Sequence, residues 1–383
     1  MRIDELSPNE PERDAEHDPG DAEESPILSG ATDTHGQRSP RGARRARVDE
    51  DTQARLDALI AEAGGTVGSR EAEHARDVMI TGLKLAGDGT TTGEALLIDR
   101  ALRELRYALN VFRPYAETPK ISVFGSARTP EDHPDYRAAV AFSRRIAEDG
   151  WMVITGAGDG IMRAGHGGAG RAASFGVAIR LPFETTANDV IEGDEKLITF
   201  RYFFTRKLVF MWMSHAIAVF PGGFGTQDEA FEALTLIQTG KAPMMPIVLC
   251  DPPGGTYWHH WDNYIRYSLL ENGWISEADT ALYYVTDDMA DAAEHVRRFY
   301  RVYHSQRFVR DRMVLRLKRA LEPADLDRLN AEFGELVADG RIEQGGALDG
   351  EREHLDLPRL HWHSTKRAYG RLRQMIDTIN GMG

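Results

Sequence analysis

The sequence predicts an α/β fold, in which a doubly wound, parallel, Rossmann-like sheet carries helical flanks on its N- and C-terminal sides. Two observations lead to this prediction. Between residues 121 and about 303, short apolar runs alternate with longer runs of helical periodicity. The apolar runs are continuous, as in strands of a parallel sheet that is buried on both faces. Such alternation is typical of a sheet covered by helices on both sides.

Seven apolar runs are the predicted strands, and glycines mark several of their turns. The strands are expected at 121–127 (with its turn), 151–155, 177–182, 195–200, 216–220, 246–250 and 281–286. Helices are expected from 134 to Gly150, after the glycine-rich run at 156–170, at 202–215, after Thr226, at 258–270 and up to about 303. Gly150 suits a C-terminal helix cap because glycine readily adopts positive φ.

Composition divides the chain into four predicted parts. Residues 1–50 are rich in acidic, Pro, Gly, Ser and Arg residues and nearly lack aromatic ones, so a disordered acidic tail is expected. Residues 51–118 carry leucines at helical spacing and form a predicted helical extension. The sheet domain is expected at 119–303. Residues 304–383 form a predicted helical C-terminal extension, with amphipathic patterns at 301–321, 323–340 and 366–379.

Charge and cysteine content favour some partners and compartments over others. The formal net charge of −14 argues against a general nucleic-acid-binding surface, although it allows a small anionic ligand. Cys250 is the single cysteine and ends an apolar run, so it is expected in a buried strand of a protein from the reducing cytoplasm. The first residues do not resemble a signal peptide, and no apolar run approaches the ~20 residues of a membrane span.

Four groups of residues are expected to meet at one edge of the sheet. In a doubly wound fold the loops after the strands and the starts of the helices share the carboxyl edge, where ligands bind. The groups are Gly125 with Ser126; Gly156, Gly158 and Gly160; Arg206 with Lys207; and the turn Pro221–Thr226 followed by Glu229. Each group alone has an ordinary structural reading as a tight turn or a helix start, and GAGDG lacks the full dinucleotide fingerprint.

The turn PGGFGT has the properties of a phosphate site. Its three glycines let the backbone approach a ligand, and N–H groups at the start of a helix attract an anion. Thr226 adds a hydroxyl, and Arg206 offers a planar fork of donors. Glu229 is the candidate general base or charge stabiliser, whereas Asp228 is explained by helix-start electrostatics.

These residues match a known family. TRK at Thr205–Lys207, followed by PGGFGTQDE and FEALTLIQTGK, resembles the signature of the LONELY GUY (LOG) family, cytokinin riboside 5′-monophosphate phosphoribohydrolases long labelled lysine decarboxylases. TGAGDGIM resembles the family's glycine loop, with Ala157 in place of a usual glycine and Asp159 in place of a usual proline. The resemblance covers about 120–300. The helical flanks are similar in layout to bacterial nucleotide 5′-monophosphate nucleosidases, which favours housekeeping nucleotides such as AMP over a hormone role.

The resemblance implies roles for these residues. Arg206 and Glu229 would be the catalytic pair. The substrate would be bound by Gly125, Ser126, Gly156, Gly158, Gly160, Met162, Lys207, Gly222, Gly223, Gly225 and Thr226. The reaction would release the base and ribose 5-phosphate from a nucleoside 5′-monophosphate, without a cofactor or metal, in a homodimer or larger homo-oligomer. His259–His260 and the pair His361 and His363 lack the further ligands of a metal site.

Three other functions are compatible with parts of the pattern. A non-catalytic carrier or sensor of a nucleotide or of molybdenum cofactor would need the phosphate turn but not both Arg206 and Glu229. A DNA-processing protein of similar fold would need a basic, aromatic face, which the acidic composition disfavours. A pyridoxal-dependent decarboxylase would need a Schiff-base lysine, for which Lys207 is a candidate only by name.

Overall fold

The computed structural model describes residues 48–181, 187–349 and 351–382. The chain divides into two compact units between Asp99 and Arg100, and the described part of each unit is treated separately. The predicted acidic tail lies outside the described residues as far as residue 47. Its last position, Glu50, already belongs to the first helix.

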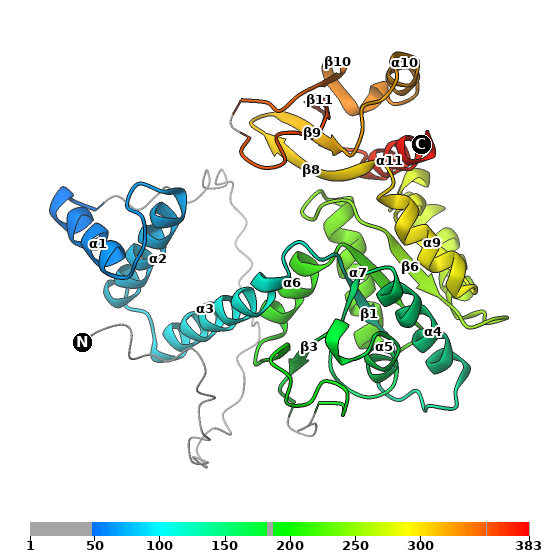
Figure 1. Cartoon of the computed structure of the whole chain (residues 1–383), viewed down its shortest axis with the longest axis horizontal. Helices are drawn as coiled ribbons and strands as arrows, with labels where there is room; N and C mark the ends of the chain where they lie inside the picture. Colours follow the sequence, from blue (N-terminus) through cyan, green and yellow to red (C-terminus); the bar gives the residue numbers. More distant parts are fainter. Residues whose placement is uncertain (1–47, 182–186, 350, 383) are drawn as a thin grey trace. The chain divides into compact units, whose positions relative to one another are not determined.

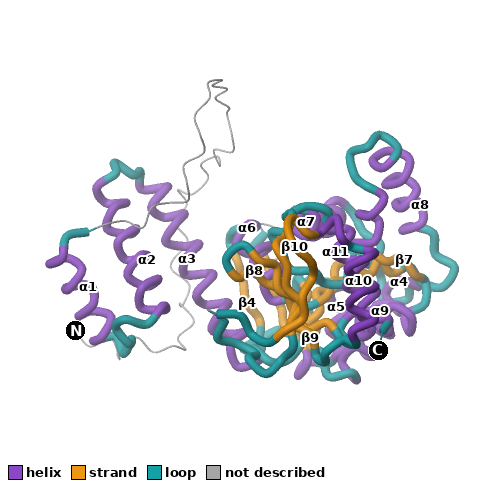
Figure 2. The backbone as a smooth tube through the Cα atoms, turned by 90° about the horizontal axis from the view of Figure 1, so that it is seen from above, coloured by secondary structure: helices purple, strands orange, loops and turns teal. Residues whose placement is uncertain are grey.

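The first unit contains a helical hairpin. Helices α1 (Glu50–Glu62) and α2 (Arg70–Gly87) lie side by side (Figure 2). Each has a polar N-cap: the Asp49 carboxylate accepts from the Thr52 N–H, and the Ser69 hydroxyl accepts from the Ala72 N–H. Such caps satisfy N–H groups that lack partners inside the helix.

The second unit contains a parallel sheet of seven strands. Its strands are β1 (Lys120–Phe124), β2 (Met152–Thr155), β3 (Ser174–Ile179), β4 (Leu197–Phe200), β5 (Ala216–Val219), β6 (Ile247–Cys250) and β7 (Tyr284–Thr286). The strand order is β4-β3-β2-β1-β5-β6-β7, and every neighbouring pair is parallel. The order runs outward from β1 in one direction and from β5 in the other. The predicted doubly wound sheet is therefore confirmed, with its topological switch point between β1 and β5.

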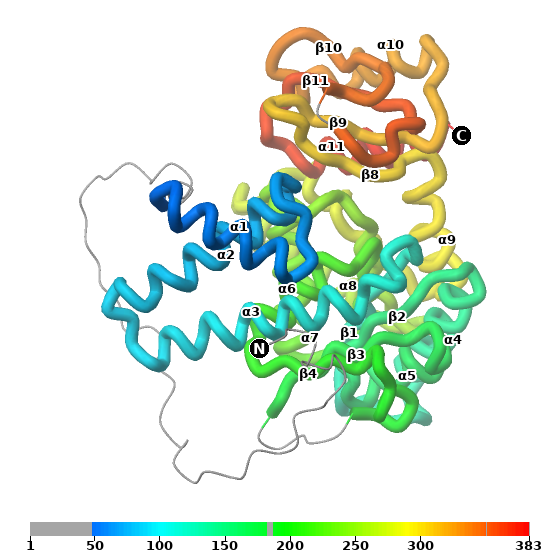
Figure 3. The backbone as a smooth tube through the Cα atoms, turned by 60° about the vertical axis from the view of Figure 1, so that its left-hand side comes forward, coloured from blue at the N-terminus to red at the C-terminus, as the bar shows by residue number. Residues whose placement is uncertain are grey.

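Helices cover both faces of this sheet (Figures 1 and 3). One face packs against α4 (Pro134–Glu148), α5 (Ile161–Ala169) and α9 (Met289–Phe299). The other packs against the C-terminal part of α3 (Thr92–Phe112) and against α6 (Phe203–Met213), α7 (Phe224–Gln238) and α8 (Tyr257–Tyr264). Side chains that alternate along one strand enter opposite cores: Val123 belongs to the first and Phe124 to the second. The strands are apolar on both sides for this reason.

Short helical segments complete the fold. They are the 3₁₀ segments η2 (Arg113–Tyr115), η3 (Arg171–Ala173), η5 (Glu277–Leu282) and η6 (Gly334–Leu336), and the π-helical η4 (Ile265–Leu270) that continues α8. No helix in the described part of the chain is both long enough and apolar enough to cross a membrane.

The C-terminal part contains a second sheet, so the predicted all-helical extension is wrong. Four antiparallel strands pair in the order β10-β11-β9-β8 (Figures 1 and 3). Their bounds are β8 (Tyr303–Val309), β9 (Arg312–Leu317), β10 (Val337–Gly345) and β11 (Arg359–Ser364), accompanied by α10 (Pro323–Glu332) and α11 (Tyr369–Gly381). The run predicted as one helix at 301–321 is a hairpin that turns at Arg310, whose φ is 58°. The run at 323–340 is helical only as far as Glu332.

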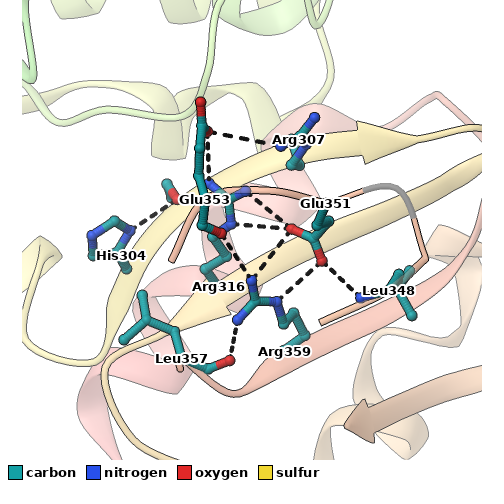
Figure 4. Close-up of polar contacts among 9 residues, drawn as sticks. His304, Arg307, Arg316, Leu348, Glu351, Glu353, Leu357 and Arg359 are labelled. Atoms are coloured by element: carbon teal, nitrogen blue, oxygen red, sulfur yellow. Dashed lines mark hydrogen bonds and ion pairs between the residues drawn. The ribbon is translucent and has the colours of Figure 1, made fainter. Parts of the chain in front are cut away.

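The helical pattern was misleading because both faces of β9 are covered. Every residue from Met313 to Leu317 is buried, so the run does not alternate between apolar and polar positions. On one side lies the shared core of the sheets. On the other, the Arg316 guanidinium reaches Glu351 in the loop before β11 (Figure 4). Periodicity does not distinguish a short helix from a strand that is buried on both faces.

A glutamate holds that loop in place. The Glu351 carboxylate receives hydrogen bonds from Arg316, from Arg359 and from the Leu348 N–H (Figure 4). The side chains of Glu351 and Arg359 are fully buried. A buried charge needs this degree of pairing, because ions lose their hydration inside a protein. The cluster therefore ties the loop to β9 and β11.

Candidate active site

A cavity of about 750 Å³ lies at the carboxyl edge of the sheet, at the switch point between β1 and β5. This volume is in the range of small-molecule sites. It is lined by Phe124, Gly125, Ser126, Ala127, Arg128, Gly156, Met162, Phe203, Arg206, Gly222, Gly223, Phe224, Gly225, Thr226, Gln227, Asp228, Glu229 and Tyr257. The turns after β1, β2 and β5 and the first turns of α6 and α7 thus meet there, as the topological rule predicts.

The turn between β5 and α7 forms one wall. No side chain caps α7, so its first N–H groups form an uncapped, electropositive helix start beside the cavity. At Gly222 a Cβ would overlap the Thr226 side chain and lie 2.9 Å from the Ser126 nitrogen. The Ser126 N–H donates to the Pro221 carbonyl at 3.1 Å. The turns after β5 and β1 are therefore packed tightly together, which only glycine at position 222 permits.

The glycines of the loop after β2 differ in position: one lines the cavity and two do not. Gly156 lines the cavity, and a Cβ there would overlap both the Arg206 guanidinium and the Met162 sulfur. Gly160 has φ of 60° and ψ of −127°, and a Cβ there would overlap the turn after β1. The Gly158 carbonyl accepts from the Asn188 side chain at 2.9 Å. Gly158 and Gly160 do not line the cavity, so the structure gives them positions in the loop's scaffold.

Buried polar side chains of Thr155, His166 and Asn188 form hydrogen bonds that hold this loop in place. The His166 ring is fully buried, with Nε2 3.0 Å from the Thr155 hydroxyl and Nδ1 facing the Asn188 amide. Asn188 Nδ2 donates to the carbonyls of Ala157 and Gly158. Burial lowers the pKa of His166, which keeps it neutral. Ala157, which stands where the family usually has glycine, adopts φ of 64°, and its N–H donates to the Thr155 hydroxyl.

Arg206 and Glu229 both line the cavity, Arg206 from the first turn of α6 and Glu229 from the second turn of α7. The Arg206 Nε–H donates to the Val177 carbonyl at 2.8 Å, and its guanidinium lies 5.2 Å from the Phe210 ring centre. Burial raises the pKa of the Glu229 carboxyl. The charges of Lys207 and Arg206 lower it, but the pKa stays raised overall. The cavity thus has a fixed cation and a carboxylate with raised proton affinity on neighbouring helices.

Lys207 takes a different position from the one the sequence suggests. It is not among the lining residues, and its ammonium contacts Asp228 at 2.9 Å, Glu232 at 2.7 Å and Glu229 at 3.7 Å. Burial would lower the pKa of Lys207, but its hydrogen bonds to Glu232 and Asp228 raise it overall. A Schiff-base lysine needs a neutral amine, so this environment disfavours the decarboxylase chemistry. Asp228 lines the cavity and pairs with Lys207; it lies beyond the first turn of α7, so the ion pair and not the helix start accounts for its position.

Sequence reasoning missed three polar residues of the cavity. Arg128 follows the turn after β1, where its N–H donates to the Ser126 hydroxyl, and its side chain is exposed. Tyr257 comes from the start of α8, and Gln227 from the first turn of α7. The sequence signal for Arg128 was its place two residues after Ser126, which was predicted at the carboxyl edge of the sheet. Tyr257 had no comparable signal, because the approach of α8 to the turn is a tertiary contact.

The histidines and the cysteine lie away from this cavity. His259 and His260 are exposed, while His361 contacts Arg312 and His363 contacts Asp311. Within the ranges that the structure describes, no group of three or more His, Cys, Asp or Glu side chains is arranged for a metal ion. Cys250 is fully buried at the end of β6, which raises the pKa of its thiol.

A family model and a known relative both match part of this chain. The family model described as "possible lysine decarboxylase" matches residues 158–296. The cytokinin riboside 5′-monophosphate phosphoribohydrolase of Mycobacterium tuberculosis is 30% identical over 150 residues, which are 38% of this chain and 77% of that protein.

Two solved structures are similar over 47% of this chain. The molybdenum cofactor carrier protein of Chlamydomonas reinhardtii is 23% identical, with a TM-score of 0.33 over 97% of its chain. The molybdenum cofactor binding protein of Rippkaea orientalis is 20% identical, with a TM-score of 0.33 over 96% of its chain. On the family model and the M. tuberculosis relative, together with the TRK and PGGFGTQDE motifs that frame the cavity, this chain belongs to the LONELY GUY (LOG) family.

Proposed function

We propose that this protein hydrolyses the N-glycosidic bond of nucleoside 5′-monophosphates, releasing the free base and ribose 5-phosphate. The observation that carries the proposal is the meeting of an uncapped helix start, Arg206 and Glu229 in one cavity. The name of the M. tuberculosis relative supports the same reaction class, with cytokinin riboside 5′-monophosphate as that protein's substrate. We propose AMP-like nucleotides as the substrate class here, with cytokinin nucleotides as a variant of it.

The 5′-phosphate is assigned to the turn Pro221–Thr226. Gly223 and Gly225 have open space beside the backbone for oxygen atoms, and the N–H groups at the start of α7 attract negative charge. Thr226 is nearly buried in the wall of the cavity and adds a hydroxyl. Binding energy gained at the phosphate can hold the sugar in a reactive position, although the phosphate is remote from the bond that breaks.

Glu229 is the proposed catalytic carboxylate. As the C1′–N bond breaks, positive charge develops on the ribose, and a nearby carboxylate stabilises it. Water then forms the new C1′–O bond as its proton passes to Glu229, the departing base nitrogen takes up a proton from solvent, and Glu229 returns its own proton to solvent, so that one water is consumed overall. The raised pKa of Glu229 suits a group that accepts a proton near neutral pH.

Arg206 is the proposed anchor for the sugar. Its Nε–H is engaged with Val177 and its guanidinium is held against Phe210, so the orientation of the fork is set before substrate binds. Such preorganisation avoids reorganisation during the reaction. Lys207, in this proposal, adjusts the charge of Glu229 and does not itself contact the substrate.

We also propose that the protein acts as a homo-oligomer. Phe204, Leu208 and Trp212 recur every fourth residue on α6 and expose 54%, 48% and 74% of their surface. An exposed apolar stripe of this kind is typical of an association surface. Light scattering on the wild type and on Trp212→Glu tests this: the variant is expected to dissociate, and a monomeric wild type would contradict it.

The direct test is base release from a panel of nucleoside monophosphates. We expect adenine and ribose 5-phosphate from AMP in equal amounts, and a loss of roughly 10²- to 10⁴-fold in kcat for Glu229→Gln. Glu322→Gln, which changes the exposed glutamate immediately before α10, serves as the matched control. If a nucleotide binds but stays intact, a carrier or sensor role replaces the enzymatic one. If Glu229→Gln retains full activity, the assigned role is wrong.

A further inference from the structure

A tyrosine from α8 holds a peptide group of the turn after β5. The Tyr257 hydroxyl donates to the Gly222 carbonyl at 2.6 Å. Tyr257 is the first residue of α8, and the N–H of the next residue, Trp258, donates to the Asp251 carboxylate at 3.0 Å. Trp258 itself is fully buried. The hydroxyl is therefore presented from a firmly anchored helix start.

Gln227 completes this arrangement. Its Nε2 lies 2.7 Å from the Tyr257 oxygen. A phenol has one proton, which the bond to Gly222 uses, so Gln227 donates and the Tyr257 oxygen accepts. The other end of the amide, Gln227 Oε1, is buried and has no hydrogen-bond partner among the described residues. An unpaired buried acceptor is unfavourable and rare. The Gln227 side chain thus keeps its hydrogen bond to Tyr257 although its own Oε1 atom has no partner in the described part of the chain.

The peptide group held by Tyr257 joins two glycines. The carbonyl of Gly222 and the N–H of Gly223 belong to one planar trans unit, so they point in opposite directions. Glycine on both sides leaves this unit with little steric resistance to rotation. When the carbonyl is bonded to Tyr257, the Gly223 N–H has its direction set as well. Gly223 lines the cavity immediately before α7 begins.

We infer that Tyr257 and Gln227 are positioning residues that lock the Gly222–Gly223 peptide group, so that its N–H faces the phosphate of the substrate. Tyr257 sets the orientation of the carbonyl, and Gln227 keeps the Tyr257 proton directed at Gly222. The inference rests on the proposed function, because it assumes that the turn binds a phosphate. It adds a source of rigidity that comes from α8 and lies outside the turn itself.

The test compares Tyr257→Phe with Tyr264→Phe, an exposed tyrosine at the other end of α8. The probes are inorganic phosphate, measured by calorimetry, and the kinetics of AMP and adenosine. For Tyr257→Phe we expect the Kd for phosphate and the KM for AMP to rise roughly five- to tenfold, the effect of one hydrogen bond. The kinetics of adenosine, which lacks the phosphate, should not change. Tyr264→Phe should match the wild type.

Gln227→Glu provides an independent test. Its carboxylate only accepts hydrogen bonds, so it competes with Gly222 for the Tyr257 proton. We expect it to weaken phosphate binding as Tyr257→Phe does, whereas Gln227→Leu should have a smaller effect. This variant decides the question if Tyr257→Phe does not fold.

The outcomes separate this inference from the proposed function. If the wild type binds phosphate but cleaves no nucleotide, the proposed reaction fails. The phosphate affinities of the variants then still test whether Tyr257 and Gln227 fix the Gly222–Gly223 peptide group. The inference is overturned if Tyr257→Phe and Gln227→Glu bind phosphate as tightly as the wild type. It is also overturned if they impair AMP and adenosine equally, because a general loss of structure would do that.

Discussion

The Lys207 ammonium lies 3.7 Å from the Glu229 carboxylate, while it forms shorter ion pairs with Asp228 and Glu232. One cation thus serves three acids on α7. Burial raises the pKa of Glu229, and Lys207 is the strongest of the charges that oppose this rise. The balance between the two decides the pH at which Glu229 carries its negative charge.

Lys207→Met should move the acid limb of the pH–rate profile to higher pH. Without the ammonium the pKa of Glu229 rises further, so the carboxylate is protonated over a wider range. Base release from AMP, measured across pH, reports the shift. Lys241→Met, an exposed lysine after α7, is the control. An unchanged limb would show that Glu229 does not govern it.

Gly156→Ala should strongly reduce activity. The new Cβ would overlap the Arg206 guanidinium and the Met162 sulfur, so the arginine must move. A displacement of about 1 Å at a positioning group can cost roughly 10²-fold in rate. Gly167→Ala on α5, where a Cβ meets nothing within 4 Å, is the control. Wild-type kcat/KM in Gly156→Ala would mean that this position of Arg206 is not needed.

Arg128→Gln should weaken the binding of nucleotides but not the binding of nucleosides. Arg128 lines the cavity beside the turn that carries the phosphate in our proposal. Losing one charged hydrogen bond should raise the KM for AMP about tenfold and reduce its dependence on salt. Kinetics with AMP and adenosine at several salt concentrations measure both effects. Arg144→Gln, on exposed α4 surface, is the control, and an equal loss for both substrates would refute the phosphate contact.

Asn188→Ala should destabilise the protein and distort the loop after β2. The Asn188 amide donates to the Ala157 and Gly158 carbonyls, which would lose their buried partner. We expect a loss of about 1–3 kcal/mol in the free energy of unfolding, measured by urea titration, with a lower kcat. Asn272→Ala, an exposed site that also donates to a carbonyl, is the control. Equal stability in the two variants would contradict the role of the network.

Glu351→Gln should destabilise the protein above pH 4.5, the ordinary pKa of a glutamate. Burial raises the pKa of Glu351, but hydrogen bonds from Arg359, Leu348 and Arg316 outweigh it, so the pKa is lowered overall. A lowered acid pKa contributes stability above its unfolded value, and that stability is lost as pH falls. Breaking a buried ion cluster costs about 3–5 kcal/mol.

Unfolding curves at neutral and acidic pH test this effect. The wild type should lose stability on acidification more steeply than Glu351→Gln, and Glu322→Gln should follow the wild type. Parallel pH curves for the wild type and Glu351→Gln would show that the buried carboxylate is not the titrating group.

Much of the fold could be read from the sequence because its signals are local. Continuous apolar runs mark strands such as Ala216–Val219, since both faces of a parallel sheet are buried. The rule that strand ends and helix starts share an edge then brings Arg206, Glu229 and the turn Pro221–Thr226 to one cavity. These positions follow from chain order alone.

The remaining features depend on contacts between distant residues. A run that looks helical is a hairpin that turns at Arg310, and its second strand, β9, lacks polar alternation because the loop that carries Glu351 covers its second face. Gly158 and Gly160 share a motif with Gly156, yet only Gly156 reaches the cavity. Sequence spacing does not distinguish a helix from a doubly covered strand, or a glycine that lines the cavity from one that does not. Each distinction depends on which distant residues pack against the backbone.

The sequence by itself therefore determined the parallel sheet with its covering helices, the edge where the candidate site lies and most of the residues that line it. Only the tertiary structure decided that Lys207 balances charge on α7 and that Tyr257 reaches Gly222 across 35 residues of chain. The physical reason is that hydrogen bonds and ion pairs depend on distances of a few ångströms between side chains, and those distances exist only after the helices have packed on the sheet.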